Sequence, residues 1–153
     1  MATIFLAGII QGSLKDRSIH AQTYRDGLLG LLRATFPGLE VYCPIENYPE
    51  SLSFSDETAR ATFLGLMARA AEADVLVAYV PEASMGTAIE MWQAHSRGRV
   101  VVAISPMAAN WAVRFLSTVV LPDSAAFEQF VRSGDFARLL EDKGIIAREA
   151  TGK

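Results

Sequence analysis

The chain is poor in the residues that build metal centres and disulfide-linked folds. Its 153 residues include one cysteine, Cys43, and two histidines, His20 and His95. One cysteine cannot form an internal disulfide, and no Cys/His cluster has the spacing of a zinc site. The histidines have no evident Ser or Cys partner for a hydrolytic triad. We therefore expect an intracellular protein without a metal, in which Cys43 is an inert buried residue rather than a nucleophile.

Long apolar runs and an excess of one charge are also missing. No apolar stretch approaches the roughly 18 residues that span a bilayer, and no positively charged leader precedes Gln11. The formal net charge is −3, and the 14 Lys and Arg residues are scattered along the chain. We expect a cytoplasmic protein that binds neither a membrane nor a nucleic-acid polymer, although a single nucleotide remains a possible ligand.

The sequence does contain enough apolar residues, 51%, for one sizeable core. Short, continuous apolar runs are typical of strands buried on both faces, and stretches with helical spacing separate them. The expected strands are Thr3–Ala7, Leu39–Cys43, Asp74–Val80, Arg99–Ile104 and Thr118–Leu121. The expected helices cover 17–35, 56–73, 85–97, 108–117 and the amphipathic tail 127–140. Pro37-Gly38 and Gly98 are helix-ending signals, and Pro122-Asp123-Ser124 stops the last strand.

This alternation predicts the α/β class, as a single-domain, Rossmann- or flavodoxin-like three-layer sandwich with a five-stranded parallel sheet. One domain should span residues 1–150, with a frayed tail at 151–153. Such sheets bind ligands outside the carboxyl ends of their strands, near the point where the strand order reverses. Functional residues are therefore expected in the loops that follow the strands.

Two of these loops carry chemically useful patterns. After the first strand, "AGIIQGS" has two glycines, Gly8 and Gly12, which allow a close backbone approach to a ligand or simply make a tight turn. After the third strand, Ser84 stands at a helix N-cap position, followed by Met85, Gly86 and Thr87. Their N–H groups could bind a phosphate, or Ser84 could be a plain cap.

Glu90 follows one and a half turns into the same helix. Its neighbours three and four residues away are Gly86, Thr87 and Ala94, a face of small residues with room for a substrate. The alternative is a solvated surface glutamate. The loop after the second strand offers Glu46, Asn47 and Tyr48, which could contact a nucleobase or be merely solvated.

The segment "ADVLVAYVPEASMGTAIE", followed by "GRVVVAIS", resembles the nucleoside 2-deoxyribosyltransferase superfamily. There a strand and a short loop lead into a Gly-Thr-Ala-x-Glu-type helix whose Glu is the nucleophile, and this implies that Glu90 is catalytic. Six residues earlier the nucleoside transferases have an Asp, whereas the nucleoside 5′-monophosphate N-hydrolases have a Ser, as at Ser84. A Ser at a helix N-terminus can accept a phosphate that an Asp would repel.

The stretch "IFLAGIIQGSLKDR" is similar to the N-terminal motif of the family, whose glycine-containing loop folds over the sugar and phosphate. The resemblance implies substrate contacts from the segment around the first loop, from the third loop and, across a homodimer interface, from the region after the fourth strand. It also implies a reaction without any cofactor. The implied substrate-binding residues are Phe5, Gly8, Ile9, Ile10, Gln11, Gly12, Ser84, Met85, Gly86, Thr87 and Asn110.

Three positions depart from the family pattern. Phe5 replaces a Tyr of many members, as in the cytidine-monophosphate hydrolases, and Gln11 replaces a phosphate-binding Arg. Leu66 falls where the family has an acidic residue near the nucleobase, and Asp56 or Glu57 could replace that acid if the helix is shifted.

The resemblance implies hydrolysis of a nucleoside 5′-monophosphate to a free base and a sugar 5-phosphate. Two alternatives remain: base exchange by a nucleoside 2-deoxyribosyltransferase, and nucleotide binding by a sensor domain without catalysis. Met107, Asn110 and Trp111 are candidates for reaching the partner subunit, although Trp111 and Phe115 could instead be core residues.

Overall fold

The computed structural model describes residues 1–12, 14 and 19–148. Its central feature is a five-stranded sheet in the order β2-β1-β3-β4-β5, with every neighbouring pair parallel. The predicted α/β fold is therefore confirmed, and each strand end lies within one residue of its predicted place. The strands are β1 (Thr3–Gly8), β2 (Glu40–Tyr42), β3 (Val75–Tyr79), β4 (Val100–Ile104) and β5 (Val119–Leu121).

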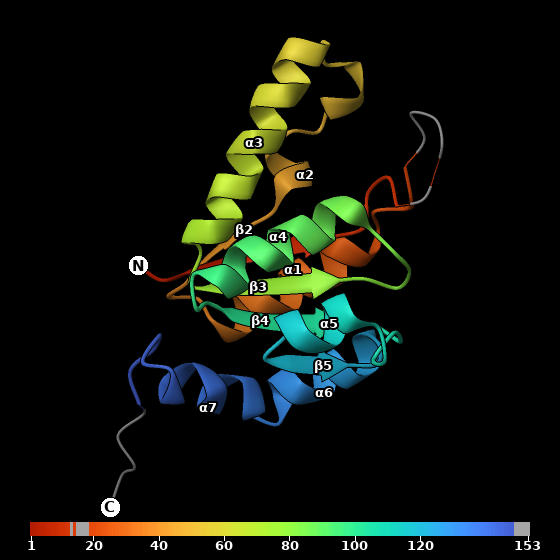
Figure 1. Cartoon of the computed structure of the whole chain (residues 1–153). Coiled ribbons are helices and arrows are strands. Elements are labelled where there is room, and N and C mark those ends of the chain that lie inside the picture. Colours follow the sequence, from red (N-terminus) through yellow and green to blue (C-terminus); the bar gives the residue numbers. More distant parts are fainter. Residues whose placement is uncertain (13, 15–18, 149–153) are drawn as a thin grey trace, which may run out of the picture.

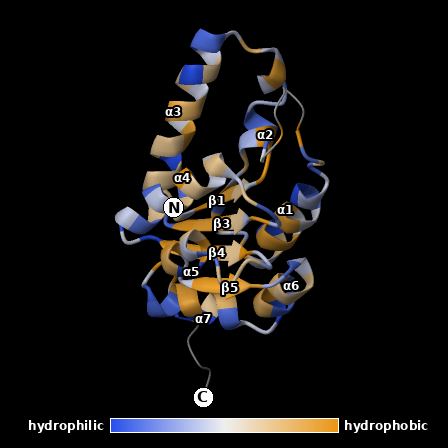
Figure 2. Cartoon of the chain, turned by 45° about the vertical axis from the view of Figure 1, so that its right-hand side comes forward, coloured by the Kyte–Doolittle hydropathy of each residue, from blue (hydrophilic) through white to orange (hydrophobic). Residues whose placement is uncertain are grey.

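Helices cover both faces of the sheet, as Figure 1 shows. The helices α1 (Tyr24–Thr35), α6 (Ser124–Arg132) and α7 (Asp135–Asp142) share one apolar core with β1, β3 and β4. On the other face α3 (Asp56–Glu72), α4 (Met85–Ser96) and α5 (Trp111–Leu116) share a second core. Figure 2 shows the strands as apolar segments between these layers, as expected for a sheet buried on both faces.

Three predicted helices need correction, and one of them, predicted at 108–117, covers only Trp111–Leu116. The first begins at Tyr24 rather than near Arg17, which lies outside the described residues. The preceding residues are held in a non-helical path by Gln22, whose Nε2 donates to the carbonyls of Ile9 and His20 at 3.1 and 2.7 Å. The predicted tail helix is two helices, α6 and α7, because Gly134 between them has a φ of 83°. The frayed tail also lies outside the described residues.

The predicted turn signals are confirmed. Helix α1 ends before Pro37-Gly38, and Gly98 has a φ of 68° after α4. Strand β5 ends at Leu121, and Asp123 then caps α6 by accepting a hydrogen bond from the N–H of Ala126 at 2.8 Å. The loop after β2 contains one turn of helix, α2 (Pro44–Asn47), and a 3-10 turn, η1 (Ser51–Ser53).

Helix α3 extends beyond the body of the domain, together with α2 and η1 (Figure 1). Its buried residues, Met67, Ala70 and Ala71, all lie in its second half. The first half exposes Phe63 and Leu64 to solvent.

The strand order places the reversal point between β1 and β3. The chain runs from β1 outward to β2 and then returns to β3 on the other side of β1. In sheets of this order, ligands bind at the carboxyl ends of these two strands. Those ends lead directly into the two loops that the sequence singles out.

Candidate functional site

The loops after β1 and β3 are joined at the reversal point. The N–H of Ile9 donates to the carbonyl oxygen of Tyr79 at 3.1 Å, so the backbone pairing continues past the end of β1. Farther out, His20 Nε2 lies 3.0 Å from Glu82 Oε1, an ion-pair distance without hydrogen-bond geometry. The structure thus brings together the two segments that were predicted separately.

Glu90, on the helix that follows the second of these loops, is only 8% exposed. The alternative of a solvated surface glutamate is therefore wrong. Burial removes the carboxylate from water and raises its pKa to about 8, while the positive charge of Arg25 acts in the opposite direction. A carboxyl group with such a pKa is a common mark of a functional site.

The two faces of α4 show why Glu90 is buried. Its small and polar face points inward, so Thr87, Glu90, Met91 and Ala94 are buried. The bulky stripe of Met85, Ile89 and Trp92 instead faces outward, at 78%, 41% and 55% exposure. The helix therefore buries its carboxylate together with Met91 and Ala94, while three other large apolar side chains face solvent, which an ordinary amphipathic surface helix avoids.

Ser84 caps α4, as predicted. Its Oγ accepts a hydrogen bond from the N–H of Thr87 at 3.4 Å and lies 2.8 Å from Thr87 Oγ1. The N–H groups of Met85 and Gly86 belong to the first turn, where a helix offers no carbonyl partner. A Cβ added to Gly86 would meet no atom within 4 Å. The helix N-terminus therefore has free donors beside open space, an arrangement suited to an anion.

The glycines of the first loop have packing roles. A Cβ on Gly8 would lie 2.3 Å from Tyr24 Oη, and one on Gly12 would lie 2.6 Å from His20 Nε2. Gly12 also has a φ of 56°. Gly8 therefore admits the Tyr24 ring, which stacks on Tyr79 with 4.1 Å between ring centroids.

The other predicted residues of the β1 segment differ in accessibility. Phe5 is 1% exposed and stacks on Tyr42 in the core, and Ile9 is equally buried. The Ile9 carbonyl already accepts from Gln22 Nε2 and Tyr24 Oη. Ile10 is half-buried, whereas Gln11 is exposed. Of this segment, Gln11 is the side chain most accessible to a ligand, and the substrate contacts of all these residues stay predictions.

Sequence reasoning missed two residues of this junction, Tyr24 and Arg25. Arg25 is 2% exposed, and burial raises the pKa of the Tyr24 hydroxyl well above its usual range. A signal was present: Arg25 lies three, four and seven residues before Leu28, Leu29 and Leu32, which places it on the apolar face of α1.

The region after β4 is exposed. Trp111 and Phe115 are 77% and 58% exposed, so the alternative that they are core residues is wrong. Asn110 caps α5, because its Oδ1 accepts from the N–H groups of Ala112 and Val113 at 3.0 and 3.3 Å. Only its amide oxygen takes part in the cap, and the side-chain NH2 group is available to donate elsewhere.

The residues considered for the nucleobase side lie apart from one another. Leu66 packs half-buried against the second core. Asp56 begins α3, ten residues earlier, so it lies about 15 Å away along the helix axis. Asp56 and Glu57 therefore do not reach the position of Leu66 within the same chain.

The loop that could contact a base is engaged in local contacts. Glu46 pairs with Arg33 at 2.7 Å, and this interaction lowers the pKa of the carboxyl group. Asn47 Nδ2 donates to the carbonyl of Cys43 at 2.9 Å, and the Tyr48 ring meets Phe54 edge-on. Cys43 itself is a buried free thiol, as expected.

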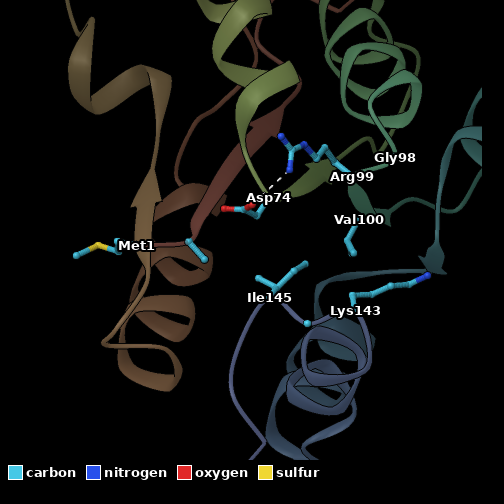
Figure 3. Close-up of a pocket in the computed structure, with 9 residues that line it drawn as sticks. Met1, Asp74, Gly98, Arg99, Val100, Lys143 and Ile145 are labelled. Carbon is cyan, nitrogen blue, oxygen red and sulfur yellow. Dashed lines mark hydrogen bonds and ion pairs between the residues drawn. The ribbon is translucent and has the colours of Figure 1, made fainter.

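A cavity of about 450 Å³ lies at the other end of the sheet, against the amino ends of β1, β3 and β4. Figure 3 shows Asp74, Arg99 and Lys143 around it, with Arg99 Nη1 3.4 Å from Asp74 Oδ1. Asp74 also accepts from the N–H of Thr3 at 2.9 Å, so its carboxylate holds β1 to β3. This cavity is away from the carboxyl ends of the strands, where ligands of this fold bind.

Among the residues that the structure describes, no three His, Cys, Asp or Glu side chains gather where they could hold a metal ion. Within the same residues, no helix has both the length and the apolar character needed to cross a membrane.

Solved structures show which proteins share this architecture. A 2-deoxyribosyltransferase from Bacillus psychrosaccharolyticus superposes with a TM-score of 0.65 at 23% identity, covering 90% of this chain and 96% of its own. The chain shares its fold with a deoxyribosyltransferase. The solution structure of BlsM gives 0.66 at 19% identity, covering 97% of both chains. A conserved protein from Enterococcus faecalis V583 gives 0.62 at 21%, covering 87% of this chain and 98% of its own.

No protein-family model and no curated protein sequence matches the chain. At these identities the structural neighbours establish the fold of the chain.

Proposed function

We propose that this protein hydrolyses the N-glycosidic bond of a nucleoside 5′-monophosphate and that Glu90 is its nucleophile. The observation that carries the proposal is the inward-facing Glu90 at the reversal point of the sheet, one and a half turns from an open helix N-terminus. A shared fold with a 2-deoxyribosyltransferase, a biocatalyst for the synthesis of nucleosides, supports this chemistry.

In the proposed reaction, the Glu90 carboxylate attacks the anomeric carbon and forms a glycosyl ester. The C–N bond breaks, and its electron pair leaves with the base, which takes up a proton. Water then attacks the ester, giving a sugar 5-phosphate and restoring Glu90. A buried carboxylate stabilises the oxocarbenium-like transition state and then captures it, by the logic of retaining glycosidases.

The phosphate would bind at the N-terminus of α4. The N–H groups of Met85 and Gly86 offer free donors there, Ser84 and Thr87, which are hydrogen-bonded to each other, could turn toward the phosphate when it binds, and the helix dipole adds a favourable field. Binding energy from this remote group would fix the sugar over Glu90. In the first loop, the exposed Gln11 would contribute to the same end of the substrate.

We further propose a homodimer with shared sites. The exposed stripe of Met85, Ile89 and Trp92 is continuous with the proposed phosphate site, because Met85 belongs to both. Helix α5 packs against α4 and adds Trp111 and Phe115 to the exposed apolar surface. A second copy on this surface would bring the Asn110 amide near the partner's site and cover large apolar side chains.

The proposal is tested by incubating the protein with ribo- and deoxyribonucleoside monophosphates and the matching nucleosides, and measuring free base by chromatography. Release from monophosphates is expected. Release from nucleosides alone would contradict the role of Ser84, and base exchange without net release would favour a transferase. Nucleotide binding without any release, unchanged in Glu90→Gln, would favour a sensor domain, the alternative suggested by Leu66 at the position of the family acid.

A further inference from the structure

A histidine and a glutamate link the loops after β1 and β3 at the edge of the proposed phosphate site. His20 Nε2 lies 3.0 Å from Glu82 Oε1. The first loop holds the histidine in place, because the N–H of His20 donates to the carbonyl of Ile10 at 2.7 Å. The imidazole ring also packs over Gly12, where an added Cβ would lie 2.6 Å from Nε2. His20 is therefore fixed beside Glu82 by its own loop.

Glu82 places a negative charge close to the N-terminus of α4. It lies two residues before the N-cap Ser84, so the two Cα atoms are at most about 7 Å apart. The Glu82 side chain is exposed. A carboxylate at this distance repels an anion that binds the free N–H groups of Met85 and Gly86. A phosphate can bind well there only if the charge of Glu82 is compensated.

His20 is placed to supply that compensation. Within the part of the chain that the structure describes, it is the one cationic side chain within 4.0 Å of the Glu82 carboxylate. The contact is an ion pair when the imidazole is protonated. A third charge nearby then meets a neutral pair instead of a full negative charge.

The pair is not needed to join the two loops. The backbone bond from the N–H of Ile9 to the carbonyl of Tyr79, at 3.1 Å, already does so. Nε2 of His20 makes no hydrogen bond among the described residues, and Glu82 is exposed, so the contact itself contributes little to stability. Its main effect is on the charge that surrounds the start of α4.

We propose that His20 and Glu82 are specificity-determining residues, which decide whether the site takes a phosphorylated or an unphosphorylated sugar. With the charge of Glu82 compensated by His20, the N-terminus of α4 accepts a phosphate. Without His20, the carboxylate repels the phosphate and favours an uncharged 5′-hydroxyl, which can donate a hydrogen bond to it. This inference rests on the proposed function, because it concerns the phosphate site of that proposal.

The test is a titration of 15N-labelled protein with inorganic phosphate, followed by NMR at the amide signals of Met85 and Gly86. His20→Gln should raise the Kd for phosphate by about five- to ten-fold, because Glu82 is then uncompensated. Glu82→Gln should lower the Kd by a similar factor. The double variant His20→Gln/Glu82→Gln, whose pair is again neutral, and His20→Lys, which keeps a cation, should both lie close to the wild type.

A matched control breaks an ion pair elsewhere. Glu128→Gln removes the partner of Arg132 on α6, in the opposite layer, and should leave the Kd unchanged. The exposed position of Glu82 makes Glu82→Gln decisive even if His20→Gln does not fold. Weaker phosphate binding in Glu82→Gln would show that the pair only holds the loops together, and an unchanged Kd would show that its charge does not reach the site. Either result would overturn the proposal.

Kinetics separates this inference from the proposed function. If base release occurs, the ratio of kcat/KM for a monophosphate to that for the matching nucleoside should fall about five- to ten-fold in His20→Gln and recover in the double variant. If phosphate binding follows the pair but no substrate releases base, the inference stands and the proposed hydrolysis fails. If phosphate moves neither amide signal while base is released, the inference fails and the role of Glu90 stands.

Discussion

At the scale of single residues, the main feature is the burial of Glu90, because an ionised carboxylate is more stable in water than inside a protein. Helical spacing correctly predicted the neighbours of Glu90 but left open whether that face is inward. Glu90 faces inward because Met85, Ile89 and Trp92, on the other side of the helix, are exposed. In a monomeric protein these larger apolar side chains would ordinarily be buried. Sequence pattern alone could not show this, because the stripe of larger residues is ordinarily the buried one.

The burial of Glu90 predicts a pH-dependent cost to stability. Its pKa is raised from 4.5 to about 8, so the folded state favours the protonated form. The associated stability is fully present below about pH 4.5 and is lost as the pH rises through 8. Glu90→Gln should therefore be more stable than the wild type by about 3 to 5 kcal/mol at high pH and nearly equal to it at low pH.

Urea unfolding over a pH series measures this difference. Glu128→Gln, at an exposed position on α6, is the matched control and should show no such trend. A constant difference between Glu90→Gln and the wild type at all pH values would mean that Glu90 is solvated.

Alanine substitutions at two glycines of the site should differ in their effect on the stability of the fold. Gly8→Ala would place a Cβ against Tyr24 Oη and should destabilise the fold by about 1 to 3 kcal/mol. Gly86→Ala meets no atom within 4 Å, so it should fold as well as the wild type while raising the KM for monophosphates. Thermal unfolding and steady-state kinetics on the two variants check this, and a strongly destabilised Gly86→Ala would contradict the open space at the helix N-terminus.

At the scale of elements, the sequence predicted all five strands because each is a continuous apolar run bounded by turn residues. Two of the missed helix boundaries have local causes. Side-chain hydrogen bonds of Gln22 hold the residues before α1, and the backbone of Gly134 turns the chain between α6 and α7. Apolar periodicity continues across such breaks and cannot reveal them.

Because Gly134 makes the break between α6 and α7, replacing it with alanine should lower the stability of the protein, whereas the same substitution at Gly30 should raise it. Gly134→Ala puts a side chain on a φ of 83° and should cost about 1 to 2 kcal/mol. Gly30→Ala, at an exposed position inside α1 with free space around it, should stabilise the protein by about 0.5 to 1 kcal/mol. Chemical denaturation of both variants measures the contrast, and equal effects would show that Gly134 is not needed for the turn.

At the scale of the whole molecule, we propose that a second copy of the chain completes the site. Leu66, where the resemblance noted in the sequence would place an acidic residue, lies on α3, and this helix extends away from the domain with its first half exposed. No sequence pattern reveals a surface that a second copy would cover, because such side chains look like core residues. The expected homodimer would account for the exposed residues of α3, α4 and α5 together.

Trp92→Glu is expected to separate the proposed dimer into monomers. A charge in the centre of an apolar interface should weaken association by about 100-fold or more, since central aromatic residues carry most of the binding energy. Light scattering after size-exclusion chromatography measures the mass, and base release should fall in parallel. Gln129→Glu on α6, on the opposite layer, introduces the same charge and should leave the mass unchanged. A wild type that is monomeric at working concentration would refute the shared site.

The central claim is that Glu90 becomes covalently attached to the sugar. Mass spectrometry of the protein, acid-quenched during turnover of a reactive nucleoside monophosphate and then digested, tests it most directly. The peptide carrying Glu90 is expected to gain the mass of a sugar phosphate, and Glu90→Gln is expected to show no adduct. Free base accumulating at full rate in Glu90→Gln, or an adduct on a different residue, would contradict it.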